Sequence, residues 1–304
     1  MSRPAAIAGV DVGGTKIAVG VLHADGTSTR IGVEPTIRGT GEANAATVRT
    51  LLRRACDTFA IVAVGLSVTT TVDGDGRFRD LTSWIGWRGW TPADVLGDMP
   101  CELRDGGSVI AANDAACGAL AEWSLGAGRG ANDTLFVSLG TGLSHSLVHD
   151  GRVLTGAHGG ALFSGYAPPA RCPWSTCEAD TVEGICSGPA LAEAYQGPGA
   201  RDARPVLDDA RDGVPAARDV VDHAAWHLGA YLAGLVQSYD PEVVVIGGGL
   251  GTGAPGYVEP AVRTARDLIR LPFASRVPFT PAALGADSGW LGAALTAAHG
   301  LDPA

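Results

Sequence analysis

Three apolar strand patterns in this 304-residue chain run directly into glycine-rich turns. The first, GVDVGGTKIAVGV at residues 9–21, places two glycines and Thr15 between two strands of small apolar residues. The same order recurs in VSLGTGLSHS at 137–146, and VVVIGGGLG at 243–251 ends a third strand in three glycines. Glycine weakens a β-strand, because its backbone loses more conformational entropy on folding than that of other residues. Each glycine turn is therefore expected to have a role with which a side chain would interfere.

Phosphate binding is one interpretation of the first turn. Gly13 and Gly14 would let backbone N–H groups approach an anion closely, and Thr15 adds a hydroxyl donor. Asp11 is repelled by phosphate but suits Mg²⁺, because hard cations take carboxylate oxygens. Lys16 faces either the nucleotide or solvent. The alternative is an ordinary tight hairpin; the two further glycine turns disfavour it, although none matches the Walker or dinucleotide-binding fingerprint in full.

The chain as a whole is acidic, with a net charge of −10, so electrostatic binding to nucleic acid or to an anionic membrane is not expected. Hydrophobic residues make up 46% and charged residues 18%, which is typical of a globular protein with room for two domains. We find no signal-peptide pattern, no apolar run of the roughly 20 residues that span a bilayer, and no disulfide framework among six scattered cysteines. We therefore expect a cytoplasmic protein.

Strand and helix patterns are mixed along the chain, which is typical of an α/β fold. The expected strands are 5–12, 16–23, 61–68, 108–114, 134–140, 143–151 and 241–249, and the expected helices 44–59, 115–126, 217–238, 257–270 and 288–300. Residues 155–200 are rich in Gly, Pro and Cys, so we expect little regular structure there. The hairpins that begin at residues 5 and 134 predict a weak internal duplication.

Longer motifs give a family resemblance that covers nearly the whole chain. They are DVGGTKIAVGV, GLSVTTTVDG (65–74), WIGWRGW (84–90), AANDAACGALAEWSLGAGRGANDTLFVSLGTG (111–142), TGAHGGA (155–161), EGICSGPAL (183–191) and the glycine loop at 247–249. This set resembles the ROK family, the bacterial sugar kinases and related repressors of the actin/hexokinase-like ATPase superfamily. The repressors carry an N-terminal helix-turn-helix, whereas here the first strand begins close to Met1, which favours the kinase branch.

The resemblance implies a two-lobed α/β fold of the actin/hexokinase-like (ribonuclease H-like) ATPase type. It implies a smaller N-terminal lobe, residues 1–114 with 288–304, and a larger lobe, residues 115–287, with nucleotide-binding and oligomerisation elements. It also implies ATP and Mg²⁺ as cofactors, a small polyol as substrate and a homodimer as the assembled form.

Asp114 is the residue on which the implied chemistry depends. In the kinases that the chain resembles, the equivalent Asp accepts the proton of the sugar's primary hydroxyl as that oxygen attacks the γ-phosphate. Asn113 would hydrogen-bond a ring hydroxyl. The sequence alone favours a helix N-cap for this Asn-Asp pair, and the resemblance reverses that preference.

The glycine turns are where the resemblance places the nucleotide. The implied cofactor-binding residues are Asp11, Gly13, Gly14, Thr15, Lys16, Thr141, Gly142, Gly248 and Gly249, with Asp11 as the candidate Mg²⁺ ligand. His145 follows the second turn; a solvent-facing strand position is the favoured interpretation, and a phosphate contact is the alternative.

Polar sugar contacts of the family are replaced in this chain. The resemblance places Phe163 where the family has a Glu that binds ring hydroxyls, and Tyr166 where it has a His that binds zinc and touches the sugar. An ungapped alignment also puts Ser83 where a sugar-binding Asn is usual. These three residues, with Asn113 and Asp114, are expected on the substrate side.

The family's zinc motif, Cys-x-Cys-Gly-x-x-Gly-Cys-x-Glu, is incomplete in RCPWSTCEADTVEG. One alignment matches Cys172 and Cys177 to the second and third cysteines and leaves Ala179 at the Glu position. The other, which we prefer because EGICSGPAL then needs no gap, makes Glu183 the substrate-binding Glu and loses the cysteines. A different Zn²⁺ site of Cys172, Cys177 and Cys186 is the less favoured alternative to three buried thiols.

The changed contacts predict a changed substrate. Replacing Glu with Phe removes about 1.5–3 kcal/mol of charged hydrogen bonding to a matched hydroxyl. We expect a hexose-like acceptor altered at ring carbons 1 to 3, with its primary hydroxyl retained. Family members in actinobacterial antibiotic pathways phosphorylate C7-cyclitols and amino sugars, and the missing Glu favours a neutral cyclitol. The alternatives are a glucokinase-type hexose kinase and a non-catalytic sugar- or nucleotide-binding regulator.

Overall fold

The chain divides into two compact units in the computed structural model, which describes residues 3–73, 75–79, 85–98, 103, 108–161, 163–173 and 179–299. The first unit comprises Met1–Glu122, Thr155–Ala161 and Ala286–Ala304, and the second Trp123–Leu154 and Leu162–Gly285. The first unit thus extends past the expected boundary at residue 114 and includes a segment that we expected in the other lobe.

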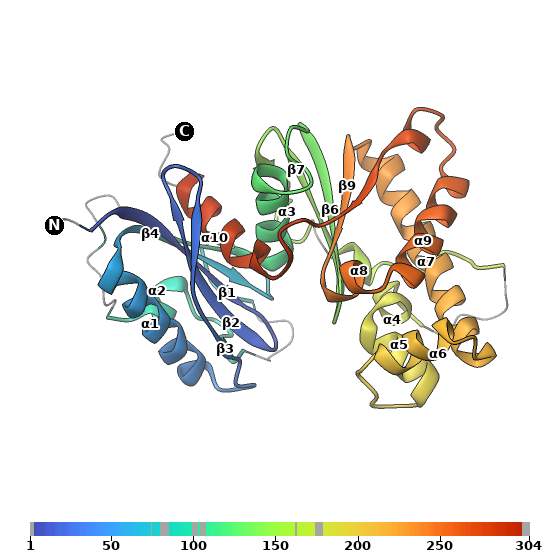
Figure 1. Ribbon diagram of the computed structural model, residues 1–304, viewed down its shortest axis with the longest axis horizontal. Coiled ribbons are helices and arrows are strands. Elements are labelled where there is room, and N and C mark those ends of the chain that lie inside the picture. The colour runs from blue at the N-terminus through green and yellow to red at the C-terminus, as the bar shows by residue number, and fades with distance from the viewer. Residues whose placement is uncertain are drawn as a thin grey trace. The chain divides into compact units, whose positions relative to one another are not determined.

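The first unit is built on a five-stranded sheet with the order β3-β2-β1-β4-β5. β1, β2 and β3 form an antiparallel meander, and β4 and β5 continue the sheet parallel to β1. The elements of this unit (Figure 1) are β1 Ala5–Val12, β2 Lys16–His23, β3 Ser28–Pro35, α1 Gly41–Thr58, β4 Ala60–Val68, α2 Pro92–Leu96, β5 Val109–Asn113, most of α3 Asp114–Leu125, and α10 Ser288–His299.

The second unit repeats this topology. Its sheet has the order β10-β9-β6-β7-β8, with β6, β7 and β8 antiparallel and β9 and β10 parallel to β6. Its elements are β6 Asp133–Leu139, β7 Leu143–His149, β8 Arg152–Val153, η1 Ser164–Tyr166, α4 Glu183–Cys186, α5 Gly188–Gln196, α6 Arg204–Arg211, α7 Pro215–Tyr239, β9 Val243–Gly247, α8 Gly249–Gly253, α9 Pro255–Leu268, η2 Ala274–Arg276 and β10 Phe279–Pro281. The shared strand pattern agrees with the predicted duplication, and the mixed α/β class is confirmed.

Helix α10 lies directly on one face of the first sheet, against β1 and β4 (Figure 1). A row of three glycines makes this possible, because Gly9 of β1 pairs in register with Gly20 of β2 and with Gly65 of β4. A Cβ atom on Gly9 would lie 1.8 Å from the carbonyl oxygen of Trp290, and one on Gly65 would lie 1.7 Å from that of Ala293. The helix backbone therefore occupies the space that side chains would take elsewhere in the sheet.

The opposite face of this sheet holds a conventional apolar core. Alternate strand residues point to it, since successive side chains of a strand face opposite sides. Helix α1 contributes Val48, Leu51, Leu52 and Ala55, whose helical spacing forms one apolar stripe. Trp87 is buried in the same core, 2% exposed.

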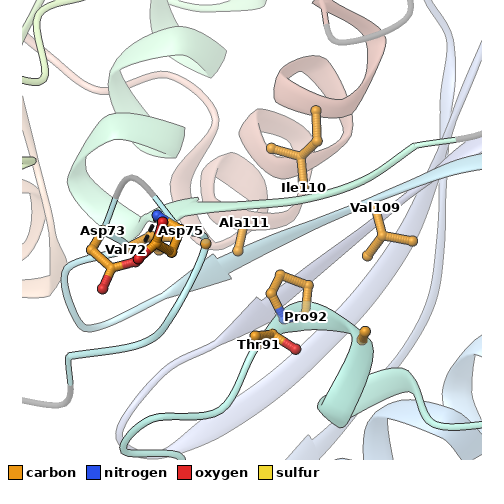
Figure 2. Close-up of a pocket in the computed structure, with 10 residues that line it drawn as sticks. Val72, Asp73, Asp75, Thr91, Pro92, Val109, Ile110 and Ala111 are labelled. Carbon is orange, nitrogen blue, oxygen red and sulfur yellow. Dashed lines mark hydrogen bonds between the residues drawn. The ribbon is translucent and has the colours of Figure 1, made fainter.

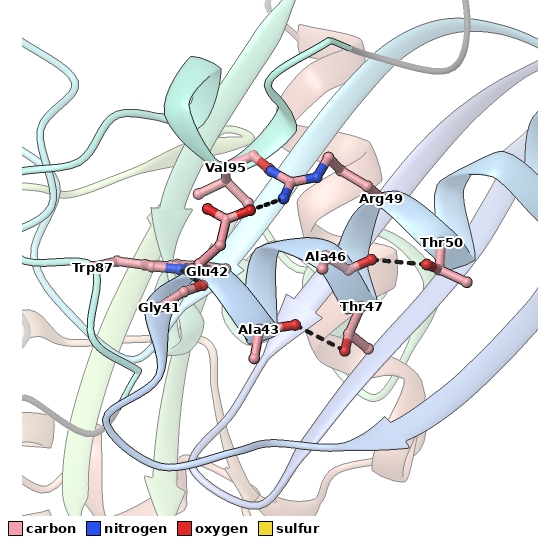
Figure 3. A network of polar contacts seen from close by, with 9 residues as sticks. All are labelled: Gly41, Glu42, Ala43, Ala46, Thr47, Arg49, Thr50, Trp87 and Val95. Atoms are coloured by element: carbon pink, nitrogen blue, oxygen red, sulfur yellow. Dashed lines mark hydrogen bonds and ion pairs between the residues drawn. The ribbon is translucent and has the colours of Figure 1, made fainter.

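The start of α1 is fixed by the segment around Trp87 (Figure 3). The Trp87 indole Nε1 donates to the Gly41 carbonyl at 2.8 Å. Further along the helix, Arg49 donates to the Val95 carbonyl at 3.0 Å and also pairs with Glu42. These contacts join α1 to residues 85–96 and define one edge of the unit.

The second unit has its core on the helix-covered face of its sheet. Leu135, Val137 and Leu139 of β6 alternate toward a cluster that includes α7 and α9, which lie against each other. Tyr257 of α9 is fully buried there, and its hydroxyl donates to the Cys186 carbonyl at 2.9 Å. This contact ties α9 to the short helix α4.

Several sequence expectations about this architecture were wrong. Residues 155–200 were expected to be largely irregular, but α4 and α5 lie there; both helices begin at glycine-containing segments that obscure their periodicity. The strand β3 and the helix α6 were not predicted, because β3 is exposed along much of its length and α6 is short. Cys56 is disulfide-bonded, although the cysteine spacing gave no indication of a bridge.

In the described residues, no helix combines the length and the apolar character needed to cross a membrane.

We predict that Gly65→Ala strongly destabilises the first unit. The added methyl group would force α10 away from the sheet, an overpacking cost of about 3 kcal/mol or more. Gly160→Ala is the matched control, because nothing lies within 4 Å of a Cβ there and we expect a change within about 0.5 kcal/mol. Urea unfolding followed by circular dichroism measures both, and equal stability of the two variants would contradict this packing.

Candidate active site

The first glycine turn joins β1 to β2 and is braced from one side. The Gly13 N–H donates to the Lys16 carbonyl at 2.9 Å, and the Thr36 hydroxyl donates to the Gly13 carbonyl at 2.7 Å. Neither Gly13 nor Gly14 has a positive φ, and a Cβ on Gly13 would be 3.5 Å from its nearest neighbour. Among the described residues the N–H groups of Gly14 and Thr15 have no bonding partner. The chain's own packing therefore does not demand glycine at residue 13.

Asp11 sits at the end of β1, on the face covered by α10. The sheet register pairs it with Ser67 of β4, whose hydroxyl donates to Asp11 Oδ1 at 2.8 Å. Gly289, in the first turn of α10, lies so close that a Cβ there would be 2.4 Å from the Asp11 carboxyl carbon. Burial raises the pKa of Asp11, and the Ser67 hydrogen bond and the Lys16 charge oppose this effect. Lys16 itself donates to the Ala286 carbonyl at 3.4 Å.

Asn113 and Asp114 mark the junction of β5 and α3. Asn113 is buried; its side-chain oxygen accepts from the Ala115 N–H at 2.8 Å and its amide donates to the Thr70 carbonyl at 3.2 Å. Asp114 Oδ1 also accepts from the Ala115 N–H, at 2.9 Å. The Ala115 N–H is thus shared between the two side chains at the start of α3, and the second oxygen of Asp114, the first helical residue, has no hydrogen bond to another described residue.

The electrostatic setting of Asp114 is unusual for an aspartate. Loss of hydration, followed by the charge of Asp11, raises the pKa of Asp114 to about 7; the Ala115 N–H and the Asn113 side chain act in the opposite direction. A carboxyl group with such a pKa exchanges its proton near neutral pH, which suits a general base.

Two glycine turns meet in the second unit. Because β6 and β9 are parallel neighbours, their carboxyl ends reach the same edge of the sheet. Gly248 has a φ of 82°, and a Cβ there would lie 2.3 Å from the Leu139 carbonyl oxygen at the end of β6. A Cβ on Gly140 would lie 3.6 Å from the Gly249 nitrogen. The structure therefore brings the second and third turns together.

A cavity of about 450 Å³ opens beside these two turns. Thr141 and Gly249 line it from the turns, and Arg201 and Arg204 from the segment that leads into α6. Both guanidinium groups are paired, Arg204 with Asp202 at 2.7 Å and Arg201 with Glu193 at 3.0 Å. The backbone groups and the threonine hydroxyl of the turns are therefore what suits this cavity to a ligand of nucleotide size.

The Glu183 side chain contacts the second glycine turn. Its carboxylate accepts from the Leu143 N–H at 2.7 Å, and a Cβ on Gly142 would lie 2.8 Å from Glu183 Oε2. A side chain at residue 142 would therefore displace the Glu183 carboxylate from its present position.

Phe163 and Tyr166 stack on each other at the short helix η1. Their ring centroids are 5.9 Å apart and the planes are within 8° of parallel. The Tyr166 residue is 49% exposed, and burial with the nearby charge of Glu183 raises the pKa of its hydroxyl. The third aligned position, Ser83, lies outside the described residues.

His145 belongs to a buried polar network, so the solvent-facing interpretation was wrong. The residue is 2% exposed, its Nδ1 contacts the Ser164 hydroxyl at 2.7 Å, and its Nε2 contacts the Tyr239 hydroxyl at 3.2 Å. Ser164 also contacts the Tyr231 hydroxyl at 2.8 Å. Burial lowers the pKa of His145 to about 4, which makes it a neutral imidazole near pH 7. Its strand alternation gave no sign of this, because the partners come from η1 and α7.

The cysteines of the expected zinc alternative are not seen as a cluster. Cys186 is buried in α4, and its thiol donates to the Ala224 carbonyl at 3.6 Å. Cys172 lies in the loop after η1 and is partly exposed, and Cys177 is outside the described residues. Within the described part of the chain, Cys172 and Cys186 do not fall into one ligand group.

A second hollow, of about 400 Å³, lies in the first unit beside β5 (Figure 2). None of the described predicted site residues lines it. Its carboxylate Asp73 is engaged in a turn, accepting from the N–H groups of Asp75 at 3.0 Å and Arg77 at 2.9 Å. It therefore carries no chemistry that the sequence pointed to.

Each unit thus gathers its own part of the predicted set. The first unit places Asp11 near Asp114, and the second places Thr141 beside the Gly248–Gly249 loop, with Glu183 behind the turn. Asp11 could also bind Mg²⁺, because hard cations take carboxylate oxygens. Its carboxylate is poorly hydrated and accepts one hydrogen bond, from the Ser67 hydroxyl.

Comparison with known proteins gives a consistent result. The family model described as "ROK family" matches residues 7–299. An N-acetylmannosamine kinase of Yersinia pestis is 30% identical, with 96% of this chain and 98% of that protein aligned. The structure is similar to a ROK hexokinase from Thermus thermophilus, with a TM-score of 0.81, 32% identity and coverage of 97% and 98% of the two chains. It is also similar to a ROK family glucokinase from Streptomyces griseus in complex with glucose and AMPPNP, with a TM-score of 0.78, 25% identity and coverage of 97% and 99%.

We predict that Asp114 makes the stability of the protein fall as pH rises from about 4 to 7. Its folded-state pKa of about 7 lies above the ordinary value, so the folded state holds a proton that the unfolded chain has lost in this range. Asp114→Asn removes the cost of the buried charge. We expect its melting temperature to exceed that of the wild type by several degrees at pH 8, and the difference to vanish near pH 4. Asp57→Asn, an exposed carboxylate on α1, is the control; a difference for Asp114→Asn that does not change with pH would contradict the assignment.

Proposed function

The chain belongs to the ROK family, and on that premise we propose that it is an ATP-dependent sugar kinase acting on a hexose-like acceptor. The observation that carries the proposal is the Asp114 carboxyl group, held where β5 meets α3 with a pKa raised to about 7. Such a group accepts a proton from an alcohol more readily than an ordinary aspartate does.

In the proposed reaction the primary hydroxyl oxygen of the acceptor forms a bond to the γ-phosphorus of ATP. The bond from that phosphorus to the β,γ-bridging oxygen breaks, ADP leaves, and the hydroxyl proton passes to an Asp114 oxygen. The Ala115 N–H is shared between Asn113 and Oδ1 of Asp114, which leaves Oδ2 of Asp114 without a hydrogen bond to another described residue. Its carboxylate is thereby available to the acceptor.

The glycine turns serve the phosphates in this proposal. In the first unit, the N–H groups of Gly14 and Thr15, which have no partner among the described residues, are donors for a phosphate. In the second unit, the cavity beside Thr141 and Gly249 has the size for a nucleotide. Asp11 would hold Mg²⁺, directly or through water, and the ion would neutralise phosphate charge. Because the turns offer backbone groups, they bind phosphate without depending on the net charge of the protein.

The acceptor that we propose is altered at ring carbons 1 to 3 relative to glucose and keeps its CH₂OH group. The stacked pair of Phe163 and Tyr166 supports this, because neither ring replaces the two hydrogen bonds of a carboxylate to sugar hydroxyls. An apolar face tolerates an amino sugar with an acetyl group, or a cyclitol. The named activity of the Yersinia relative, on an N-acetylated amino sugar, agrees with the first of these, and the glucose bound to the Streptomyces protein keeps glucose as the second candidate.

We predict that Asp114→Asn lowers kcat for phosphoryl transfer by about 10²–10⁴-fold, because the amide accepts no proton. The nucleotide turns are untouched, so the dissociation constant for an ATP analogue should change by less than about threefold. Coupled-enzyme kinetics and calorimetric titration measure the two, with Asp57→Asn as the control. A variant that retains wild-type kcat would refute the assigned base.

A panel of acceptors tests the substrate class. We expect a C1- to C3-modified acceptor, either N-acetylated amino sugar or C7-cyclitol, to exceed glucose in kcat/KM. The double variant Phe163→Glu with Tyr166→His should raise kcat/KM for glucose at least about tenfold, which corresponds to one regained charged hydrogen bond. Phe273→Glu, at another exposed aromatic residue of this unit, should change nothing. Glucose as the best acceptor of the wild type would favour the ordinary glucokinase instead.

A further inference from the structure

Helix α7 carries a pair of histidines that the sequence analysis did not use. His223 and His227 are one turn apart, so their side chains share a face of the helix. Their ring centroids are 4.7 Å apart in an edge-on arrangement. Two histidines at this spacing on a helix can bind one metal ion together.

Cys172 comes to this pair from a distant part of the chain. It lies in the loop that follows η1, and its Sγ is 4.0 Å from His223 Nε2. One potential ligand atom from each of Cys172, His223 and His227 lies within 4.8 Å of the others. In a tetrahedral zinc site, Zn–S and Zn–N bonds of about 2.3 and 2.0 Å put sulfur and nitrogen roughly 3.5 Å apart. A small closure of the present arrangement therefore gives bonding distances.

The state of His227 is a second and independent observation. The residue is only 1% exposed, yet neither of its ring nitrogens has a hydrogen-bond partner among the described residues. Buried polar atoms without a partner destabilise a fold, and a metal ion bound to one of them removes that cost. The Trp226 ring lies edge-on to His227 at 5.0 Å and adds apolar cover.

We propose that Cys172, His223 and His227 bind one Zn²⁺ ion in the second unit. One thiolate and two imidazoles are a ligand set that zinc prefers, and a water molecule would complete the tetrahedron. Binding releases the Cys172 thiol proton to solvent, because the thiolate is the ligand. This ligand set differs from the one that the sequence offered, since it replaces two cysteines with histidines of α7.

The proposed ion would connect the loop after η1 to α7. That loop continues the segment that carries Phe163 and Tyr166, so zinc would order the region next to the aromatic pair. The inference is independent of the phosphoryl transfer proposed above, because none of its three ligands has a part in that step.

Metal binding to the full-length protein tests the site. Chelator-stripped protein is titrated with Zn²⁺ in competition with a chromophoric chelator, and Co²⁺ in place of Zn²⁺ reports a thiolate ligand through its near-ultraviolet charge-transfer band. We expect one Zn²⁺ per chain, a tenfold or greater loss of affinity in Cys172→Ser and in His227→Gln, and loss of the cobalt band in Cys172→Ser. Cys186→Ala and His149→Gln, at a buried cysteine and an exposed histidine of the same unit, should bind as the wild type does.

Two results would overturn the proposal. One is a folded wild type that binds no Zn²⁺ at micromolar concentrations; the other is unchanged affinity and an unchanged cobalt band in Cys172→Ser. A loss confined to Cys186→Ala would assign the metal to other ligands. Circular dichroism checks the fold of each variant, and Cys172→Ser carries the test if His227→Gln does not fold, because Cys172 is partly exposed.

Discussion

The seating of α10 on a row of glycines is the contact on which the first unit depends. Gly20, Gly9 and Gly65 lie side by side across β2, β1 and β4; the helix backbone fills the space above Gly9 and Gly65, and the Trp290 ring fills that above Gly20. Without Cβ atoms in this row, the helix approaches close enough for its first turn to reach Asp11. Close packing in one part of the face thus places a carboxylate and a helix terminus together at the end of β1, where the chemistry is proposed.

The cost of this arrangement is electrostatic. Asp11 and Asp114 lie in one poorly hydrated region, and each prefers to be neutral there. A stability-driven design would replace one of them with an amide or an apolar side chain. The proposed function explains their presence, since the proposed base must be able to take a proton and the proposed ligand of Mg²⁺ must carry charge.

The two units share one sheet topology but place different groups at the ends of their strands. In each, the first strand of an antiparallel meander leads into a glycine turn, and a parallel strand lies beside it. In the first unit the parallel neighbour β4 supplies Ser67 to the carboxylate, whereas in the second unit β9 supplies a further glycine loop and a cavity. The difference lies in the residues at the strand ends, which are a polar side chain in β4 and glycines in β9.

Local pattern alone determined the strand–turn–strand units, the α/β class, and the position of Asn113 and Asp114 between a strand and a helix, because these depend on residues close together in sequence. The tertiary structure alone decided that His145 is buried among hydroxyl groups, and that Cys172 lies beside two histidines of α7. It also brought the Glu183 carboxylate against Gly142, a residue 41 positions earlier in the chain. These contacts join distant segments, and their formation depends on how the sheet and helices pack rather than on any periodicity that a single segment carries.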